Sequence, residues 1–181
     1  VQGRIEAVID FATARGWRAG DNPARWRGHL DKLLAAPGRV RKVRHHPAMP
    51  YAELPGFVAK LRGTEGTCAR ALEFLVLTAC RTGEVLGATW DEIDLEGRVW
   101  TVPPARMKAK REHRVPLSDA ALAVLERLPH VVGNPFVFAG ARHGRPLSNM
   151  ALLQLMRGMG YGVGGDSGDY VPHGFRSSFR D

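Results

Sequence analysis

The sequence predicts a mainly α-helical α+β fold in two parts. From about residue 47 we expect a helical domain with a small antiparallel sheet of three strands, preceded by the tail of a separate helical domain. Apolar residues recur at helical spacing on both sides of residues 93–117, and within that range they alternate as they do in strands. The 181 residues suffice for one domain and part of a second, each with its own core.

The beginning of the chain predicts two helices and a linker. Apolar residues follow helical spacing over residues 4–15, and the pattern ends before the Asn22-Pro23 step. A second, short helix fits residues 26–34. Residues 37–50 are rich in Arg, Lys and His and contain few apolar residues, so we predict a basic linker between two modules.

Four further helices are predicted, over residues 51–61, 67–79, 118–128 and 148–159. The segment 67–79 is so evenly apolar that we expect it to be the central helix of the core. Ser118 and Ser148 are the expected N-caps of the last two helices, because a serine hydroxyl accepts a hydrogen bond from the first turn.

The period of the sequence changes after Ala88, where strand formers become frequent. A β-hairpin is predicted with its turn at residues 96–98, and a third strand at residues 113–117. Residues 136–138 predict a short extended segment. Residues 160–171 contain five glycines and are expected to form a flexible loop.

Charge and composition exclude several classes of protein. The chain holds 26 Lys and Arg against 18 Asp and Glu, a net charge of +8, which favours a polyanionic partner, although a solvated basic surface would look the same. No apolar run approaches the length that crosses a bilayer. Cys68 and Cys80 suit neither a zinc pair nor a disulfide framework, so a reducing cytoplasm is expected. A small-substrate enzyme is disfavoured because we find no nucleophile elbow, Walker loop or metal-ligand cluster.

Four cationic residues lie at the ends of predicted elements: Arg81, Lys108, His173 and Arg176. An arginine that emerges from a buried helix needs a carboxylate or a bound anion. Glu84 is the local carboxylate for Arg81, so a structural ion pair is as good an interpretation as an anion site, and Gly83 would permit a tight turn between them. Lys108 lies in a basic run, for which a solvated surface is the usual explanation.

His173 and Arg176 are three residues apart, with Pro172 at a plausible first helical turn. At that spacing they share one face of a helix at its start. A helix start, a histidine and an arginine together suit a phosphate. The His-x-x-Arg pattern alone is weak, because it arises often by chance.

The order of these motifs resembles the tyrosine recombinase, or phage integrase, family, and more narrowly the prophage-type integrases of bacteria. The resemblance rests on Arg-Thr-Gly-Glu at 81–84, Arg-Met-Lys at 106–108, His-Arg-Val-Pro-Leu-Ser at 113–118 and His-Gly-Phe-Arg at 173–176. It extends from about residue 44 to residue 181, and more loosely over residues 1–43. It implies that residues 1–36 are the C-terminal part of a helical core-binding domain, residues 37–50 the linker, and residues 51–181 a catalytic domain.

The chemistry that the resemblance implies is a phosphoryl transfer that needs no metal and no cofactor. A tyrosine attacks a DNA phosphodiester, Arg81 and Arg176 bind the non-bridging oxygens, and Lys108, with Lys110 as runner-up, protonates the leaving 5′-oxygen. His173 would donate to the phosphate or assist proton transfer, and Glu84 would orient Arg81. The residues expected to contact the DNA backbone are Arg39, Arg41, Lys42, Arg44, Lys110, Arg111 and Arg114.

The family keeps its nucleophile after the His-x-x-Arg helix, whereas Tyr51, Tyr161 and Tyr170 all precede His173. Helical patterns also reach both ends of the chain, so we expect a piece of a longer polypeptide that binds DNA without cutting it. The resemblance further implies attachment-site duplex DNA as partner, additional protomers on that DNA, no membrane, and a location with the nucleoid in bacterial cytoplasm. A DNA-binding module without chemistry remains the alternative.

Overall fold

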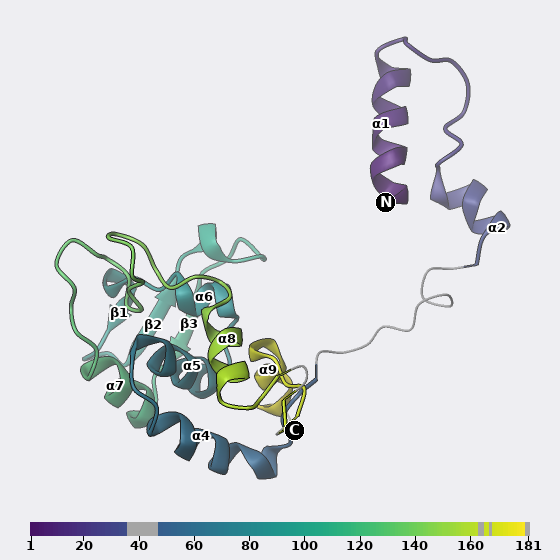
Figure 1. The fold of residues 1–181 in the computed structure, drawn as a ribbon. Helices are drawn as coiled ribbons and strands as arrows, with labels where there is room; N and C mark the ends of the chain where they lie inside the picture. The colour runs from purple at the N-terminus through teal and green to yellow at the C-terminus, as the bar shows by residue number, and fades with distance from the viewer. Residues whose placement is uncertain (36–46, 163–164, 167, 180–181) are drawn as a thin grey trace. The chain divides into compact units, whose positions relative to one another are not determined.

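The computed structural model describes residues 1–35, 47–162, 165–166 and 168–179 (Figure 1). The chain forms two compact units, Val1–His45 and His46–Asp181. Among the described residues no helix is both long enough and apolar enough to cross a membrane.

The first unit contains α1 (Gln2–Ala14), the short helical turn η1 (Trp26–Leu30) and α2 (Asp31–Leu33). The single helix predicted over residues 26–34 is wrong, because Arg27 and Gly28 have non-helical backbone angles that break it. Buried Asn22 ties the connecting segment to α1 through hydrogen bonds from its side-chain amide to the Glu6 carbonyl oxygen (2.8 Å) and Asp10 Oδ1 (2.7 Å).

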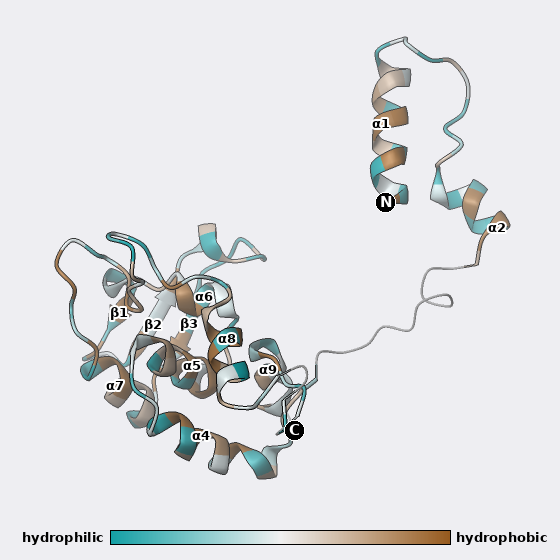
Figure 2. Cartoon of the chain, in the orientation of Figure 1, coloured by the Kyte–Doolittle hydropathy of each residue, from teal (hydrophilic) through white to brown (hydrophobic). Residues whose placement is uncertain are grey.

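The second unit is mainly helical. Its longer helices are α4 (Leu54–Arg62), α5 (Thr67–Thr78), α6 (Thr82–Leu86), α7 (Asp119–Glu126), α8 (Ala151–Gly158) and α9 (Phe175–Ser178). Short turns of helix are η2 (Tyr51–Glu53), η3 (Trp90–Glu92), η4 (Pro104–Arg106) and η5 (Pro172–Gly174). As the sequence predicts, α5 is central: it packs against α4, α6, α7 and α8, and Leu72, Phe74 and Leu75 are fully buried. Hydrophobic and hydrophilic residues lie side by side along the covering helices α4 and α7 (Figure 2).

The predicted three-stranded antiparallel sheet is present, with strands β1 (Ile93–Asp94), β2 (Val99–Val102) and β3 (His113–Pro116) in the order β1-β2-β3. Trp100 pairs with Val115 in this register. The Trp100 ring is fully buried and lies 5.5 Å from the Phe74 ring of α5. The alternating pattern therefore turns one face of the sheet toward the central helix.

The helix ends agree only in part with the predicted caps. Ser118 Oγ accepts a hydrogen bond from the Ala121 N–H (3.3 Å) at the start of α7. Ser148 is not a cap, because α8 begins at Ala151, whose N–H donates to the backbone oxygen of Ser148 (3.0 Å). The tight turn after α5 also differs from expectation: Ala79, with φ of 51°, takes the left-handed conformation, and Gly83 lies inside α6.

The glycine-rich segment 160–171 is attached near both of its ends to the α4 region. The Tyr161 ring packs edge-on against Phe57 of α4, with 5.0 Å between centroids. The Tyr170 hydroxyl donates to Glu53 Oε2 (3.1 Å), just before α4. Both tyrosine side chains therefore contact the α4 region instead of extending into solvent.

Candidate phosphate-binding site

Arg81 is held by Glu84 at the start of α6. Its backbone N–H donates to Glu84 Oε2 (2.8 Å), and its Nη1 donates to Oε1 (2.5 Å). The Glu84 side chain is buried, whereas 44% of the Arg81 side chain is exposed. The carboxylate therefore fixes both the backbone and the guanidinium of Arg81, and the structural ion pair that the sequence left open is present.

The charge state of Glu84 depends on the arginines around it. Burial by itself would raise the pKa of this carboxyl. The two hydrogen bonds from Arg81, together with the positive charges of Arg81 and Arg176, outweigh burial and hold the pKa of Glu84 below its ordinary value. Glu84 is therefore a carboxylate at neutral pH, which suits a group that orients an arginine.

Arg176 is tied to the same turn from the other end of the chain. Its Nη1 donates to the carbonyl oxygen of Ala79 (2.7 Å), the left-handed residue that ends α5. Burial raises the pKa of the neighbouring Cys80 thiol above its ordinary value, and the positive charges of Arg176 and Arg81 act in the opposite direction without cancelling it. Arg176 is therefore hydrogen-bonded to a residue two positions before Arg81, at the C-terminal end of α5.

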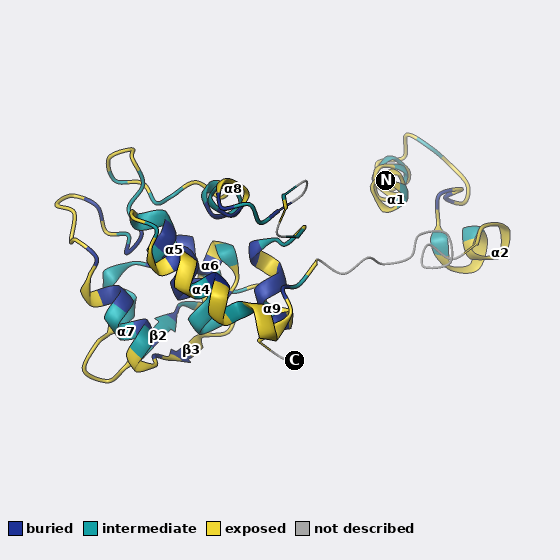
Figure 3. Cartoon of the chain, turned by 60° about the horizontal axis from the view of Figure 1, so that its bottom comes forward, coloured by how far each residue is buried: buried dark blue, intermediate teal, exposed yellow. Residues whose placement is uncertain are grey.

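The short helix that carries Arg176 is fixed by packing. Phe175 stacks on Phe57 with 5.1 Å between ring centroids, and Ser178 Oγ donates to the Met49 carbonyl oxygen. A Cβ added at Gly174 would lie 2.1 Å from the Pro47 carbonyl oxygen, so only glycine fits there. α9 consequently has a buried and an exposed side (Figure 3).

His173 lies in η5, three residues before Arg176, in a helical stretch that continues into α9. Its side chain is exposed, and the neighbouring Pro172 and Gly174 are buried. The segment that carries His173 and Arg176, the two side chains predicted to share a face, is therefore anchored by its buried residues Pro172 and Gly174.

The predicted lysines lie in the connection between η4 and β3. Lys108 and Lys110 are exposed, and the Lys110 N–H donates to the Met107 carbonyl oxygen (3.0 Å) in a tight turn. Lys110 has φ of 51°, a left-handed conformation. Arg111 and Arg114 are exposed as well, the latter on β3. The remaining predicted DNA contacts, Arg39, Arg41, Lys42 and Arg44, lie outside the described residues.

Arg106, two residues before Lys108, differs from the exposed lysines. Its Nη1 donates to both carboxylate oxygens of Glu92, and its Nη2 donates to the Glu84 carbonyl oxygen. Only 24% of its side chain is exposed. Trp100 Nε1 donates to the same Glu92 carboxylate (3.0 Å). Sequence reasoning missed this network because the hairpin fold, rather than local spacing, brings Glu92 to Arg106.

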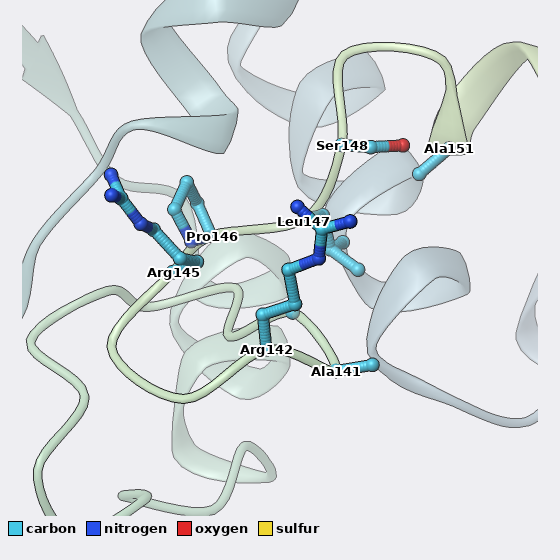
Figure 4. Close-up of a pocket in the computed structure, with 8 residues that line it drawn as sticks. Ala141, Arg142, Arg145, Pro146, Leu147, Ser148 and Ala151 are labelled. Carbon is cyan, nitrogen blue, oxygen red and sulfur yellow. The ribbon is translucent and has the colours of Figure 1, made fainter.

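A hollow of about 690 Å³ lies elsewhere, in the loop before α8 (Figure 4). Its lining residues are Gly140, Ala141, Arg142, Arg145, Pro146, Leu147, Ser148 and Ala151. The predicted phosphate ligands Arg81, His173 and Arg176 do not line it. Within the described parts of the chain, no group of three His, Cys, Asp or Glu residues could hold a metal ion.

Comparison with known proteins gives one consistent result. The profile of the Phage integrase family matches residues 55–180. The integrase of Enterobacteria phage P4 is 29% identical over 196 residues, which cover 99% of this chain and 42% of that protein. Prophage integrase IntZ of Escherichia coli (strain K12) is 34% identical over 152 residues, which cover 83% of this chain and 36% of that protein. The chain spans less than half the length of these curated relatives.

The fold has solved counterparts as well. A lambda integrase tetramer bound to a Holliday junction matches with a TM-score of 0.65 at 19% identity, over 98% of this chain and 51% of that chain. At this identity the similarity concerns the fold alone, a mainly helical domain with a three-stranded antiparallel sheet.

Proposed function

Because this chain belongs to the Phage integrase family of tyrosine recombinases, we propose that it forms the phosphate-binding part of a site-specific DNA recombinase. Such an enzyme breaks and rejoins phosphodiesters to integrate a prophage or another mobile element. The observation that carries the proposal is that Arg176 hydrogen-bonds to Ala79, at the end of α5, while Arg81, two residues further along the chain, is held by Glu84. We place this recombinase in the bacterial cytoplasm, where the DNA lies.

Arg81 and Arg176 bind the non-bridging oxygens of the scissile phosphate. The charge on these oxygens develops in the transition state, so donors fixed beforehand stabilise that state most. Glu84 accepts a hydrogen bond from Nη1 of Arg81, and the Ala79 carbonyl accepts one from Nη1 of Arg176. Each guanidinium is thereby oriented and keeps further N–H donors for the phosphate. A buried carboxylate that stays ionised keeps Arg81 in this orientation.

Lys108 donates a proton to the 5′-oxygen as the bond between phosphorus and that oxygen breaks, and His173 donates to the phosphate or assists the transfer. Lys110 is the second candidate for the acid, although its left-handed backbone fits a residue that shapes the turn. The bond that forms joins phosphorus to a tyrosine oxygen, which leaves a 3′-phosphotyrosyl link and a free 5′-hydroxyl.

Exposed cationic side chains supply the binding to the DNA backbone. The exposed Lys110, Arg111 and Arg114 contact backbone phosphates, together with the cations of residues 37–50. Residues 1–36 act as the end of a core-binding domain and residues 51–181 as the catalytic domain. Further protomers assemble on the same DNA, by analogy with the lambda integrase tetramer.

The chain by itself binds DNA and does not cleave it. Of its three tyrosines, Tyr161 packs on Phe57 and Tyr170 donates to Glu53, and all three precede the helix of Arg176. The arginines, lysine and histidine stabilise a transition state but cannot form the covalent intermediate.

The test is a DNA-binding and adduct assay on this chain. For about five neutralised phosphates, log K falls against log salt with a slope of roughly −4 to −5. A nicked duplex that traps covalent intermediates should give no protein adduct. Salt-insensitive binding would refute the basic interface, and a phosphotyrosyl adduct through Tyr161 or Tyr170 would refute the placement of the site.

A further inference from the structure

One half-buried arginine, Arg106, connects the Arg81 region of the proposed site with the segment of Lys108. The guanidinium of Arg106 contacts Glu92 through Nη1 and the Glu84 carbonyl oxygen through Nη2. Glu84 is also the residue whose carboxylate holds Arg81. Two positions after Arg106 along the chain comes Lys108. A single side chain therefore joins the helix of the phosphate-binding arginine to the segment of the predicted acid.

The surroundings of Arg106 leave it little freedom. Its guanidinium lies against Gly87 so closely that a Cβ there would come within 2.9 Å of Nη2. Glu92 is fixed in turn by the indole N–H of Trp100, which is fully buried. Charge-assisted hydrogen bonds of this kind hold a planar guanidinium in one orientation, which a lysine could not reproduce.

Lys108 lacks such anchors. Within the described residues its side chain makes no hydrogen bond and no ion pair, and it is exposed. What fixes its backbone is the residue pair before it, because Arg106 is bound to Glu92 and Glu84 while Met107 packs against the core. After Lys108, the next regular element is β3, which begins only at His113, so the anchor nearest to Lys108 is the one that precedes it.

We propose that Arg106 is a positioning residue, which holds the Lys108 segment against α6 so that the proton donor and the Arg81 guanidinium keep a fixed relation. The proposal rests on the proposed function, because it concerns the delivery of the Lys108 proton to the 5′-oxygen. A displacement of about 1 Å in a reacting group costs on the order of 10²-fold in rate. Loosening Arg106 should therefore slow the step that needs the acid and no other step.

The test compares two substrates in the complete recombinase polypeptide that carries this chain. One is the natural DNA, and the other has sulfur in place of the bridging 5′-oxygen at the cleavage site. A thiol is far more acidic than an alcohol, so the sulfur leaves as a thiolate without a proton donor. The variants are Arg106→Lys, Lys108→Met as the reference for a lost acid, and Arg176→Lys as the reference for a weakened phosphate ligand.

We expect Arg106→Lys to cleave natural DNA about 10- to 100-fold more slowly than wild type and to cleave the sulfur substrate within about threefold of wild type. Lys108→Met should show the same rescue, and Arg176→Lys should not. Arg98→Lys is the matched control, because Arg98 also pairs with a carboxylate, that of Asp119, but at the surface beside α7. It should behave as wild type on both substrates.

A second measurement separates positioning from stability and uses the 181-residue chain alone. In Arg106→Lys, the amide hydrogens of Met107 and Lys110 should exchange about tenfold faster, and those of the paired Trp100 and Val115 should not change. Equal acceleration at all four amides would overturn the proposal, since Arg106 would then only support the fold.

The cleavage assay also has outcomes that overturn it. Equal slowing of Arg106→Lys on oxygen and sulfur substrates would show that Arg106 does not act through Lys108, and so would an unchanged rate on natural DNA. A wild-type polypeptide that cleaves neither substrate would instead refute the proposed function itself, which keeps the two failures distinguishable.

Discussion

Replacing Glu84 by glutamine should destabilise the protein at neutral pH and much less in acid. The carboxylate accepts two hydrogen bonds from Arg81, one from the backbone and one from the guanidinium. Glutamine has the same shape but one acceptor oxygen and no charge, so one charge-assisted bond is lost. Such a bond contributes roughly 1.5–3 kcal/mol when buried, and less here because the Arg81 side chain is 44% exposed. The expected loss is about 1–2 kcal/mol.

The pH dependence follows from the direction of the pKa shift. Because the folded state lowers the pKa of Glu84, its stabilisation is complete above the pKa of the unfolded chain and disappears as pH falls through the lower, folded value. Wild type should therefore lose its advantage over Glu84→Gln in acid, below the ordinary range of a glutamate near pH 4.

The assay is thermal unfolding of both proteins at pH 7 and at about pH 3. A loss of 1–2 kcal/mol corresponds to a drop in Tm of roughly 3–10 °C for a unit of this size. Glu96→Gln, at an exposed position of the β1–β2 turn, is the control and should change Tm little at either pH. A Tm difference for Glu84→Gln that is the same at both pH values would refute the reasoning, because a change of shape rather than of charge would then be responsible.

Three further substitutions test other parts of the account. Lys110→Gly should leave the free energy of unfolding unchanged or higher, because the left-handed conformation of this lysine costs roughly 1–2 kcal/mol. The same substitution should make the salt slope of DNA binding shallower by about 0.9, because one phosphate contact is lost. An unchanged slope would remove Lys110 from the interface. Gly174→Ala should lower Tm and weaken DNA binding, since the new Cβ would meet the Pro47 carbonyl, and normal values of both would contradict that contact. Trp100→Phe should cost about 2 kcal/mol in urea unfolding, because Glu92 loses the indole hydrogen bond, although it keeps its pair with Arg106, and a void opens in the core. A cost near zero would show that the indole bond to Glu92 contributes nothing.

The sequence predicted those features that depend on local pattern. The uniform apolar character of α5 predicted a central helix, and the alternation in β2 and β3 predicted the sheet, because burial of one face dictates both periods. The Arg81–Glu84 pair lay within local reach at a spacing of three residues. These elements required no knowledge of distant contacts.

The features it missed depend on contacts between distant segments. The bond from Arg106 to Glu92 exists only once the hairpin places η3 beside η4. Ser148 fails as a cap because its backbone oxygen, instead of its hydroxyl, receives the first N–H of α8. The placement of Arg176 on the Ala79 carbonyl likewise required α9 to dock on the core through Phe175.

The central claim is that Arg81 acts on the phosphate in the transition state, and Arg81→Lys in the complete polypeptide tests it most directly. Lysine keeps the charge but not the planar fork, so binding to attachment-site DNA should stay within about threefold of wild type. Formation of the covalent adduct should fall by about 100-fold or more, as it does when a fixed donor to developing charge is removed. Affinity and adduct formation that decline by the same factor, or an adduct formed at the wild-type rate, would contradict the claim.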